Sequence, residues 1–241
     1  MSAIIPLKIK YEYENRPYFL YPTVIKGKKK HILVNLGYPG SLPLIEEALR
    51  QEGIEPKTIR TVYFTHHHDE AIGAAAEWKK KYWRTKFMTS IEEAPFIDGR
   101  KKPFKVEQAE QLLEAAEDEL QEQTAAQYMV ALASIPPVKI HRTVADGNRL
   151  PVETIAEVIA TPGQTVGHTS IYCPEENIVI AGEAAAKEKS YITIGDMNTA
   201  LDLKEASESL EKMIHLDPEM IICYKTGIFA KSEETEYTEQ D

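Results

Sequence analysis

The chain has 241 residues, 43% of them hydrophobic and 27% charged, which is an ordinary composition for a soluble globular protein of one large or two small α/β domains. The formal net charge of -10 argues against a nucleic-acid-binding surface, because neutralising phosphates requires clustered Lys and Arg. The two cysteines, Cys173 and Cys223, lie far apart in apolar contexts and predict buried free thiols rather than a disulfide.

The N-terminal residues lack the charged and apolar blocks of a signal peptide, and no apolar run approaches the length of a membrane span. We therefore expect a cytoplasmic protein that makes no contact with a membrane.

The first third of the chain predicts β-strands at 7–13, 18–25 and 31–36. The basic segment 26–30 separates the last two and is typical of a solvated turn. A helix is predicted over 42–51, with Ser41 as its N-terminal cap and Gly53 just beyond its end.

The middle of the chain predicts a strand at 61–64, a helix over about 71–82 and a short strand at 86–89. Residues 91–136 carry no strand signal, and apolar residues recur there at helical spacing. We interpret 1–241 as a single domain that contains 91–136 as a helical insertion. An amphipathic helix packed on its own domain is favoured for the insertion; a lid or a homodimer surface is the alternative.

The last third predicts strands at 157–160, 169–172 and 177–181, a helix over 203–215 and a closing strand at 220–224. Tyr191, Asp196 and Asn198 fall in a segment that we interpret as a plain connecting loop, although it is close enough in sequence to reach a site at Glu183. The polar tail from Lys231 is expected to fray.

The sequence 65–73, Thr-His-His-His-Asp-Glu-Ala-Ile-Gly, carries the strongest chemical signal. It follows an apolar strand and precedes an Ala-rich helix, and ligands of α/β proteins bind at that edge of a sheet. His66 and His68 are two residues apart and point the same way from an extended segment. His67 then points the other way and is expected to be packed, while Asp69 is suited to capping the next helix.

This stretch resembles the T-H-x-H-x-D-H signature of the metallo-β-lactamase superfamily, in which two His, the Asp and the last His bind zinc or iron. Four further segments resemble the superfamily in the expected order: 32–37 its early I-D-T-G strand, 160–170 its T-P-G-H-T-x-G-H-T-S loop, 180–184 its G-D-A segment, and 223–227 its closing strand. His168 occupies the place of the second, supporting His of the loop.

Several ligand positions of the family pattern hold other residues here. In the first motif, Glu70 replaces the Asp and Ala71 replaces the last His. Asn35 replaces the acid of the early strand, and Gln164 replaces the ligand His of the loop. Glu183 replaces the bridging Asp, and Lys225 or Thr226 replaces the closing His. The resemblance then implies that a second metal is lost and that at most one remains, on His66, His68 and Glu183, with Gln164 as a weak ligand. Glu70 is a candidate catalytic general base or further carboxylate ligand; alternatively, Lys225 forms a salt bridge with it.

The resemblance implies an α/β protein with the four-layer αβ/βα sandwich of the superfamily. It also implies a hydrolase-like protein whose single metal, zinc, manganese or iron, activates water against a small ester, lactone or thioester. The competing hypothesis is a non-catalytic member without metal that binds a small molecule or a partner protein in the former cleft. A third is a mononuclear iron protein with oxidative chemistry, because two His and one carboxylate match such sites.

Overall fold

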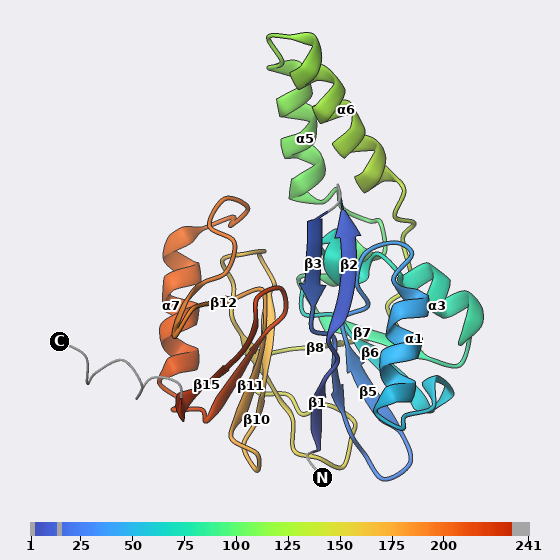
Figure 1. Cartoon of the computed structure of the whole chain (residues 1–241), viewed down its shortest axis with the longest axis vertical. Coiled ribbons are helices and arrows are strands. Elements are labelled where there is room, and N and C mark those ends of the chain that lie inside the picture. The colour runs from blue at the N-terminus through green and yellow to red at the C-terminus, as the bar shows by residue number, and fades with distance from the viewer. Residues whose placement is uncertain (1–2, 14–15, 233–241) are drawn as a thin grey trace, which may run out of the picture.

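The computed structural model describes residues 3–13 and 16–232, which form two β-sheets packed face to face with helices outside them (Figure 1). The first sheet has the order β1 (Ile4–Pro6), β4 (Thr23–Ile25), β5 (His31–Val34), β6 (Ile59–Tyr63), β7 (Lys86–Ser90) and β8 (Arg142–Val144). The second has the order β15 (Gly227–Ala230), β14 (Met220–Cys223), β11 (Ile178–Gly182), β10 (Thr169–Cys173) and β9 (Glu157–Ala160). Two hairpins, β2 (Ile9–Tyr13) with β3 (Arg16–Leu20) and β12 (Ala185–Glu188) with β13 (Tyr191–Ile194), complete the strands.

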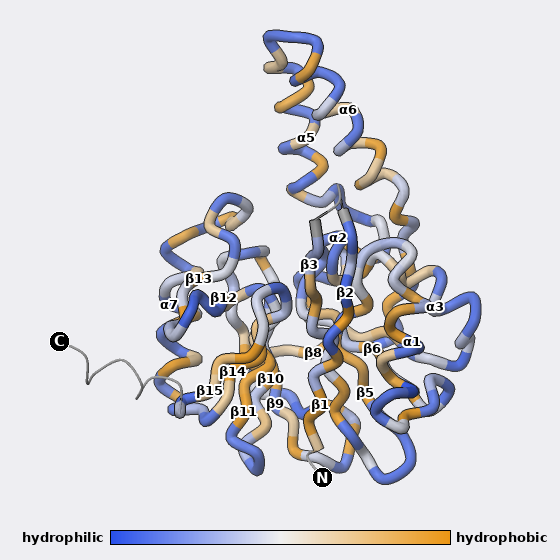
Figure 2. Tube along the Cα trace, viewed as in Figure 1, coloured by the Kyte–Doolittle hydropathy of each residue, from blue (hydrophilic) through white to orange (hydrophobic). Residues whose placement is uncertain are grey.

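Alternation of apolar side chains along the strands produces three separate cores and hence four layers. In β5, Ile32 packs between the sheets whereas Leu33 packs under the helices α1 (Leu42–Gln51) and α3 (Ala75–Lys81). In β11, Ile180 faces the first sheet and Val179 faces α7 (Leu203–Ile214). Successive side chains of a strand point to opposite faces, so a strand that is apolar throughout is buried on both. Figure 2 shows this concentration of hydrophobic residues along the central strands.

The four-layer sandwich predicted from the sequence is therefore present, and most predicted elements lie within two residues of their observed bounds. The predicted strand 18–25 is wrong, because the chain breaks at Tyr21–Pro22 between β3 and β4. Pro22 has no N–H for a strand ladder, and Tyr21 instead donates its N–H to Tyr224 O at 2.8 Å.

The predicted helix 71–82 is also two elements, α2 (Asp69–Ile72) and α3. The break falls at Gly73 and Ala74, where the Ala74 N–H donates to Gly37 O of the neighbouring turn. A Cβ at Gly73 would lie 2.4 Å from Pro39 Cδ, so only glycine allows this close approach. Ser41 precedes α1 as expected, but its hydroxyl does not cap the helix and is buried without a partner among the described residues.

Residues 91–136 contain α4 (Ala94–Ile97), α5 (Phe104–Glu114) and α6 (Glu119–Ala133), and no strand. Helices α5 and α6 form an antiparallel hairpin that stands away from the sheets (Figure 1). Ala109 and Ala125 are buried, whereas Leu112 and Leu120 are 57% and 73% exposed. Most of this helical segment therefore packs on itself, and the predicted packing of one amphipathic helix along the domain is wrong.

The short strands, the cysteines, the C-terminal tail and the membrane prediction can also be compared with the structure. Strands β1, β8, β12, β13 and β15 were not predicted. Cys173 and Cys223 are buried free thiols, as expected. The predicted frayed tail lies outside the described residues from 233 onward. Within the described ranges, no helix is long and apolar enough to cross a membrane.

Candidate metal centre

The strands of the two sheets bring their carboxyl ends to a common edge, and the polar side chains of the motifs follow those ends. Strands β5, β6, β7 and β8 run parallel to one another, and β11 runs parallel to β14. His66 and His68 follow β6, Glu183 follows β11 and Lys225 follows β14. Glu70 lies in α2, immediately after the histidines. Segments far apart in the sequence thus meet at one place.

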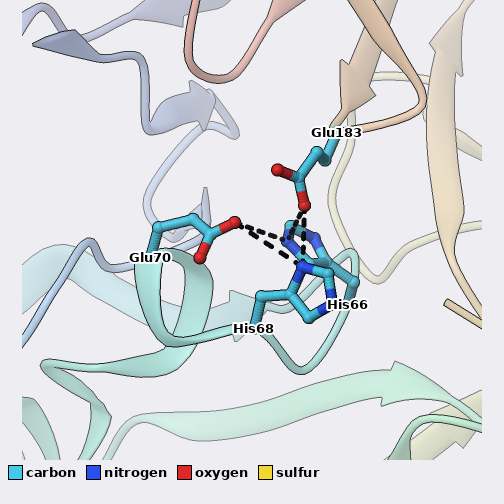
Figure 3. A group of neighbouring side chains, drawn as sticks. All are labelled: His66, His68, Glu70 and Glu183. Carbon is cyan, nitrogen blue, oxygen red and sulfur yellow. Dashed lines mark hydrogen bonds and ion pairs between the residues drawn. The ribbon is translucent and has the colours of Figure 1, made fainter. Parts of the chain in front are cut away.

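Four donor groups, those of His66, His68, Glu70 and Glu183, point toward one another at this edge (Figure 3). His66 Nε2 lies 3.2 Å from Glu183 Oε2 and 3.7 Å from Glu70 Oε1. His68 Nδ1 lies 2.8 Å from Glu183 Oε2 and 3.6 Å from Glu70 Oε1. All four residues are at most 3% exposed. The cluster is therefore buried and compact.

These spacings fit a single divalent cation. Ligand atoms about 2.0–2.2 Å from a tetrahedral zinc are separated from one another by roughly 3.3–3.5 Å, and the observed distances lie around that value. His66 Nε2 and Glu70 Oε1 are buried with no hydrogen-bond partner among the described residues. Orphaned buried polar atoms aimed at a common point require a further group, and a cation satisfies both at once.

Two lysines bind the carboxylates of the cluster, each through the oxygen that points away from the histidines, and Lys225 also lies near the inward oxygen of Glu70. Lys225 Nζ donates to Glu183 Oε1 in a very short contact and lies 3.7 Å from Glu70 Oε1. Lys105 Nζ, from α5, donates to Glu70 Oε2 at 3.1 Å and to Asp69 Oδ1 at 2.9 Å. Such outer partners fix the orientation of ligand groups. The predicted contact between Lys225 and Glu70 is present, but the closer partner of Lys225 is Glu183.

The charges of this cluster are strongly coupled. Burial alone would raise the pKa of Glu70 and Glu183, but the lysines and histidines hold the pKa of both carboxyls well below the usual range. Burial would lower the pKa of His66, but the two carboxylates outweigh it and raise that pKa to about 9. Without a metal, His66 therefore carries a proton at neutral pH, and a cation must displace it in order to bind.

His66 is oriented from behind by Thr65 and Asn35. Thr65 Oγ1 lies 2.8 Å from His66 Nδ1 and accepts a hydrogen bond from Asn35 Nδ2 at 3.0 Å. Asn35 Oδ1 accepts the Thr65 N–H at 3.0 Å, and Asn35 itself has the left-handed φ of 63° that Asn tolerates. Asn35 therefore keeps an ordering role where the family pattern has an acid, and it leaves Nε2 of His66 directed into the cluster.

Glu183 is positioned by His168, as the sequence predicted for a supporting histidine. Glu183 donates its backbone N–H to His168 Nε2 at 3.0 Å, and His168 Nδ1 lies 2.9 Å from Thr161 Oγ1. Burial lowers the pKa of His168 to about 3, so this ring stays neutral and accepts the bond. Gly182 has φ +60°, and a Cβ there would lie 2.7 Å from His168 Nε2. Glycine is thus required immediately before Glu183.

His67 does not join the donor cluster, in agreement with its predicted packed role. Its Nδ1 lies 2.5 Å from Glu93 Oε2, and its ring stacks on Phe96 at 4.5 Å between centroids. Glu93 also accepts hydrogen bonds from the Thr165 hydroxyl and the Gly167 N–H. Burial raises the pKa of Glu93, but His67 and these donors bring it down to about 2. The ionised Glu93 thereby ties the histidine loop to the 161–168 loop.

Gln164 is 2% exposed, and neither its amide oxygen nor its amide nitrogen has a partner among the described residues. A Cβ at Gly195 would lie 1.8 Å from Glu183 O and 2.9 Å from Gln164 Nε2, so Gln164 lies close to the backbone of Glu183. A ligand role for the amide oxygen of Gln164 stays a prediction.

A cavity of about 310 Å³ opens beside Glu183 and Lys225. Gly195, Asp196 and Asn198, which follow the hairpin β12–β13, line its other side. Asp196 Oδ2 is 3.6 Å from Lys225 Nζ. The interpretation as a plain connecting loop is therefore wrong for Asp196 and Asn198, which line this cavity, whereas Tyr191 is the first residue of β13 and does not line it.

Sequence analysis missed two residues that complete the site. Lys105 was not singled out, because a lysine near the start of a helix carries no signal of burial. Tyr224 donates its hydroxyl to Glu70 O at 2.7 Å and accepts the Gly37 N–H, which ties α2 to the closing strand. Asp69 was predicted to cap a helix and instead pairs with Lys105.

A four-layer αβ/βα sandwich with buried His and carboxylate donors at the carboxyl edges of its sheets defines a hydrolase-like class of metal-binding proteins. The family model described as "Metallo-beta-lactamase superfamily" matches residues 17–225 of this sequence. The chain belongs to the metallo-beta-lactamase superfamily. A comparison with curated proteins returned no match.

Solved structures show the same fold. A metallo-beta-lactamase family protein from Thermus thermophilus, TTHA1429, has 20% identity and a TM-score of 0.69 over 96% of this chain and 76% of its own. TTHA1623 in a di-iron-bound form has 18% identity and a TM-score of 0.65 over 96% of this chain and 97% of its own. A metallo-beta-lactamase from Pontibacter korlensis has 16% identity and a TM-score of 0.64 over 97% and 92%. At these identities the likeness establishes the fold.

Proposed function

We propose that this chain is a hydrolase that uses one divalent metal, held by His66, His68 and Glu183. The observation that carries the proposal is the excess of negative charge around the two inward-facing histidine nitrogens. Four carboxylates, those of Asp69, Glu70, Glu183 and Asp196, share only two ammonium groups, those of Lys105 and Lys225. An excess of two negative charges beside donors at metal-ligand spacing suits one divalent cation.

A divalent cation held by His66, His68 and Glu183 would supply Lewis acidity at this place. Glu70, kept ionised by Lys105, accepts a hydrogen bond from the attacking water and orients it, which is the general-base position predicted from the sequence. Lys225 fixes Glu183 and faces the cavity of about 310 Å³, where its ammonium stabilises negative charge that develops on a substrate oxygen. Gln164 adds a neutral oxygen to the same shell.

The dimensions of that cavity favour a small substrate, and we propose an ester, lactone or thioester. The metal is zinc, manganese or iron. Zinc would be held by the two histidines and the carboxylate of Glu183, which are ligand types that it prefers. Iron or manganese would accept Glu70 or Gln164 in addition and still keep open positions.

A second candidate, a non-catalytic member that binds a small molecule in the same cleft, is favoured by one specific observation. Lys225 and Lys105 already bind both carboxylates of the cluster, and a proton on His66 adds a further positive charge. With His66 protonated, three positive charges face the four carboxylates, and the excess of negative charge falls from two to one. The two candidates differ in whether the inward oxygens bind metal.

Metal analysis of the full chain, purified without chelator or added metal, tests the proposal. We expect about one zinc or manganese per chain, and loss of that metal in a His66→Ala/His68→Ala double variant. Iron in its place would support oxidative chemistry, and metal-free protein would favour the non-catalytic candidate.

The matched control is His215→Ala, which removes an exposed histidine at the end of α7 and should leave the metal content unchanged. Full metal content in the His66→Ala/His68→Ala variant would refute the proposed ligand set. Hydrolysis of p-nitrophenyl acetate and of a simple lactone by the metal-loaded protein, lost in Glu70→Gln, would then establish the reaction class.

A further inference from the structure

The opposite edge of the first sheet gathers cations. Strands β5 to β8 are parallel neighbours, so their amino ends lie side by side. His31, Lys86 and Arg142 are the first residues of β5, β7 and β8, and Arg60 is the second residue of β6. A strand of five residues is roughly 17 Å long, and β6 separates this edge from the histidines. The cationic edge is therefore distinct from the candidate metal centre.

Two adjoining cavities open at these amino ends, with volumes of about 550 and 440 Å³. The larger is lined by five Lys and Arg residues and two histidines: Lys30, Arg60, Arg84, Lys86, Arg142, His31 and His141. The smaller shares Arg60 and Arg84 with it and adds Lys29, Lys57 and Lys81. Among the described residues, neither lining contains an Asp or a Glu. Both cavities are thus positively charged, although the net charge of the chain is -10.

The cations of the larger cavity are not neutralised by the fold. Lys81 and Lys57, at the outer side, face Glu46 and Glu55. By contrast, Lys30, Arg60, Lys86 and Arg142 form no ion pair with any acid in the described part of the chain. Like charges held together without partners raise the energy of the folded chain. Folding gains nothing from this arrangement, which therefore suits an anionic ligand.

The pKa of His141, which lines the larger cavity, responds to the lysines around it. Burial first, and then the neighbouring Lys79, Lys139 and Lys86, lower the pKa of His141. His141 Nδ1 accepts the Phe87 N–H at 3.1 Å, so its ring orientation is fixed by the backbone of β7. Of these lysines, Lys86 is the one that lines the larger cavity.

An exposed aromatic ring borders the same cations. Trp83 lines the smaller cavity, is 68% exposed, and has the Arg84 guanidinium 4.7 Å from its ring centroid. A flat apolar ring beside cationic groups offers stacking for a base next to sites for phosphates.

We propose that these paired cavities bind the di- or triphosphate group of a small ligand. Several cations at one place match the several charges of a condensed phosphate better than the single charge of a carboxylate, and Arg residues suit phosphate oxygens. A volume of about 550 Å³ is in the range that holds a small molecule. The phosphates can come from a nucleotide or from inorganic polyphosphate, and Trp83 distinguishes the two.

The test is titration of the full chain with tripolyphosphate and, separately, with ATP, at low ionic strength and without divalent metal. The chain has two tryptophans, and Trp78 is fully buried, so fluorescence of Trp83 reports on the site. We expect saturable binding of one ligand per chain. A Lys86→Glu/Arg142→Glu variant, both positions exposed, should bind at least about tenfold more weakly.

The matched control is Lys10→Glu/Lys204→Glu, which makes the same change in net charge at two exposed lysines elsewhere. It should change affinity by less than about twofold, and circular dichroism confirms that both variants fold. Trp83→Phe, followed by calorimetry, separates the sources. If Trp83→Phe binds ATP more weakly but tripolyphosphate equally well, the ligand class is a nucleotide. If Trp83→Phe binds both as the parent chain does, the ligand class is inorganic polyphosphate.

Three results would overturn the proposal: no saturable binding of either ligand, equal weakening in the control variant, or loss of binding in His66→Ala/His68→Ala. The last would place the phosphates at the metal centre instead. None of these results bears on metal content, so the proposed hydrolase stands or fails separately.

Discussion

The two edges of the six-stranded sheet handle charge in opposite ways. At the carboxyl edge, acids and cations are buried together, and each carboxylate of Glu70 and Glu183 has one oxygen on a lysine and one toward the histidines. At the amino edge, cations such as Arg60, Lys86 and Arg142 line cavities without acidic partners among the residues described. One edge is paired and buried, and the other is unpaired and open.

The stability of the fold should therefore depend on the paired charges of the carboxyl edge and much less on the unpaired charges of the amino edge. A buried ion pair that loses one partner leaves an uncompensated charge in a medium that solvates it poorly, which costs stability. An exposed cation without a partner is solvated by water, so its removal costs little. Substitutions at the two edges should therefore change the free energy of unfolding by different amounts and in opposite directions.

The largest effect is expected for Lys225→Met in the metal-free protein. It removes the ammonium that binds Glu183 and leaves two buried carboxylates with Lys105 and the histidines. Loss of one partner of a fully buried pair costs about 3–5 kcal/mol; because Lys225 is 30% exposed, we expect about 2 kcal/mol. Urea denaturation measures this change in the free energy of unfolding.

Adding zinc or manganese should recover most of that loss, since a cation between the histidines and Glu183 compensates the same carboxylate. Lys204→Met, which removes one side of an exposed pair with Glu208, is the control and should change stability by less than about 0.5 kcal/mol. If Lys225→Met were as stable as the parent chain, the carboxyl edge would not depend on pairing.

The sequence predicted the carboxyl edge far better than the amino edge, for a physical reason. His66 and His68 stand two residues apart in one local pattern, whereas Glu183 was assigned to the site through the resemblance of 180–184 to the superfamily's G-D-A segment. Lys105 could not be predicted, because its position beside Glu70 depends on the path of the helical hairpin. Likewise Arg60, Lys86 and Arg142 are unremarkable in sequence and become neighbours only through the parallel order of three strands.

The four-layer fold followed from the resemblance to the superfamily and its individual elements from alternation and turn signals; the errors lie where long-range contacts override local preference. Pro22 divides a predicted strand because the neighbouring Tyr21 bonds to Tyr224, about two hundred residues away. Gly73 divides a predicted helix because Pro39 packs against it. Net charge carries no information on where the cations lie.

At the carboxyl edge we also expect an effect of pH on stability, which comes from His168. Its pKa is about 3 in the folded chain, lowered by burial, against about 6.5 when unfolded. Between these values the unfolded chain binds a proton that the folded chain does not. Stability from this group is therefore complete above pH 6.5 and decreases as the pH falls toward 3, by at most about 1.4 kcal/mol per pH unit.

A His168→Gln variant should show a shallower decrease of unfolding free energy between pH 6.5 and about 4 than the parent chain, because glutamine does not titrate. Glutamine also retains an oxygen that can accept the Glu183 N–H. His215→Gln, at an exposed helix end, should leave the slope unchanged. Equal slopes in all three proteins would contradict a neutral, buried His168.

The smallest effect, and the one of opposite sign, is expected for Lys86→Gln at the amino edge. Lys86 is exposed and lies among cations, so removing its charge relieves repulsion and should raise stability by a few tenths of a kcal/mol at low ionic strength. At about 1 M salt the screening length falls to about 3 Å and the gain should disappear. Lys204→Gln, which loses an attractive contact with Glu208, should show a change of the opposite sign. A destabilisation of about 1 kcal/mol by Lys86→Gln would mean that this cation is paired in solution, and the contrast between the two edges would then fail.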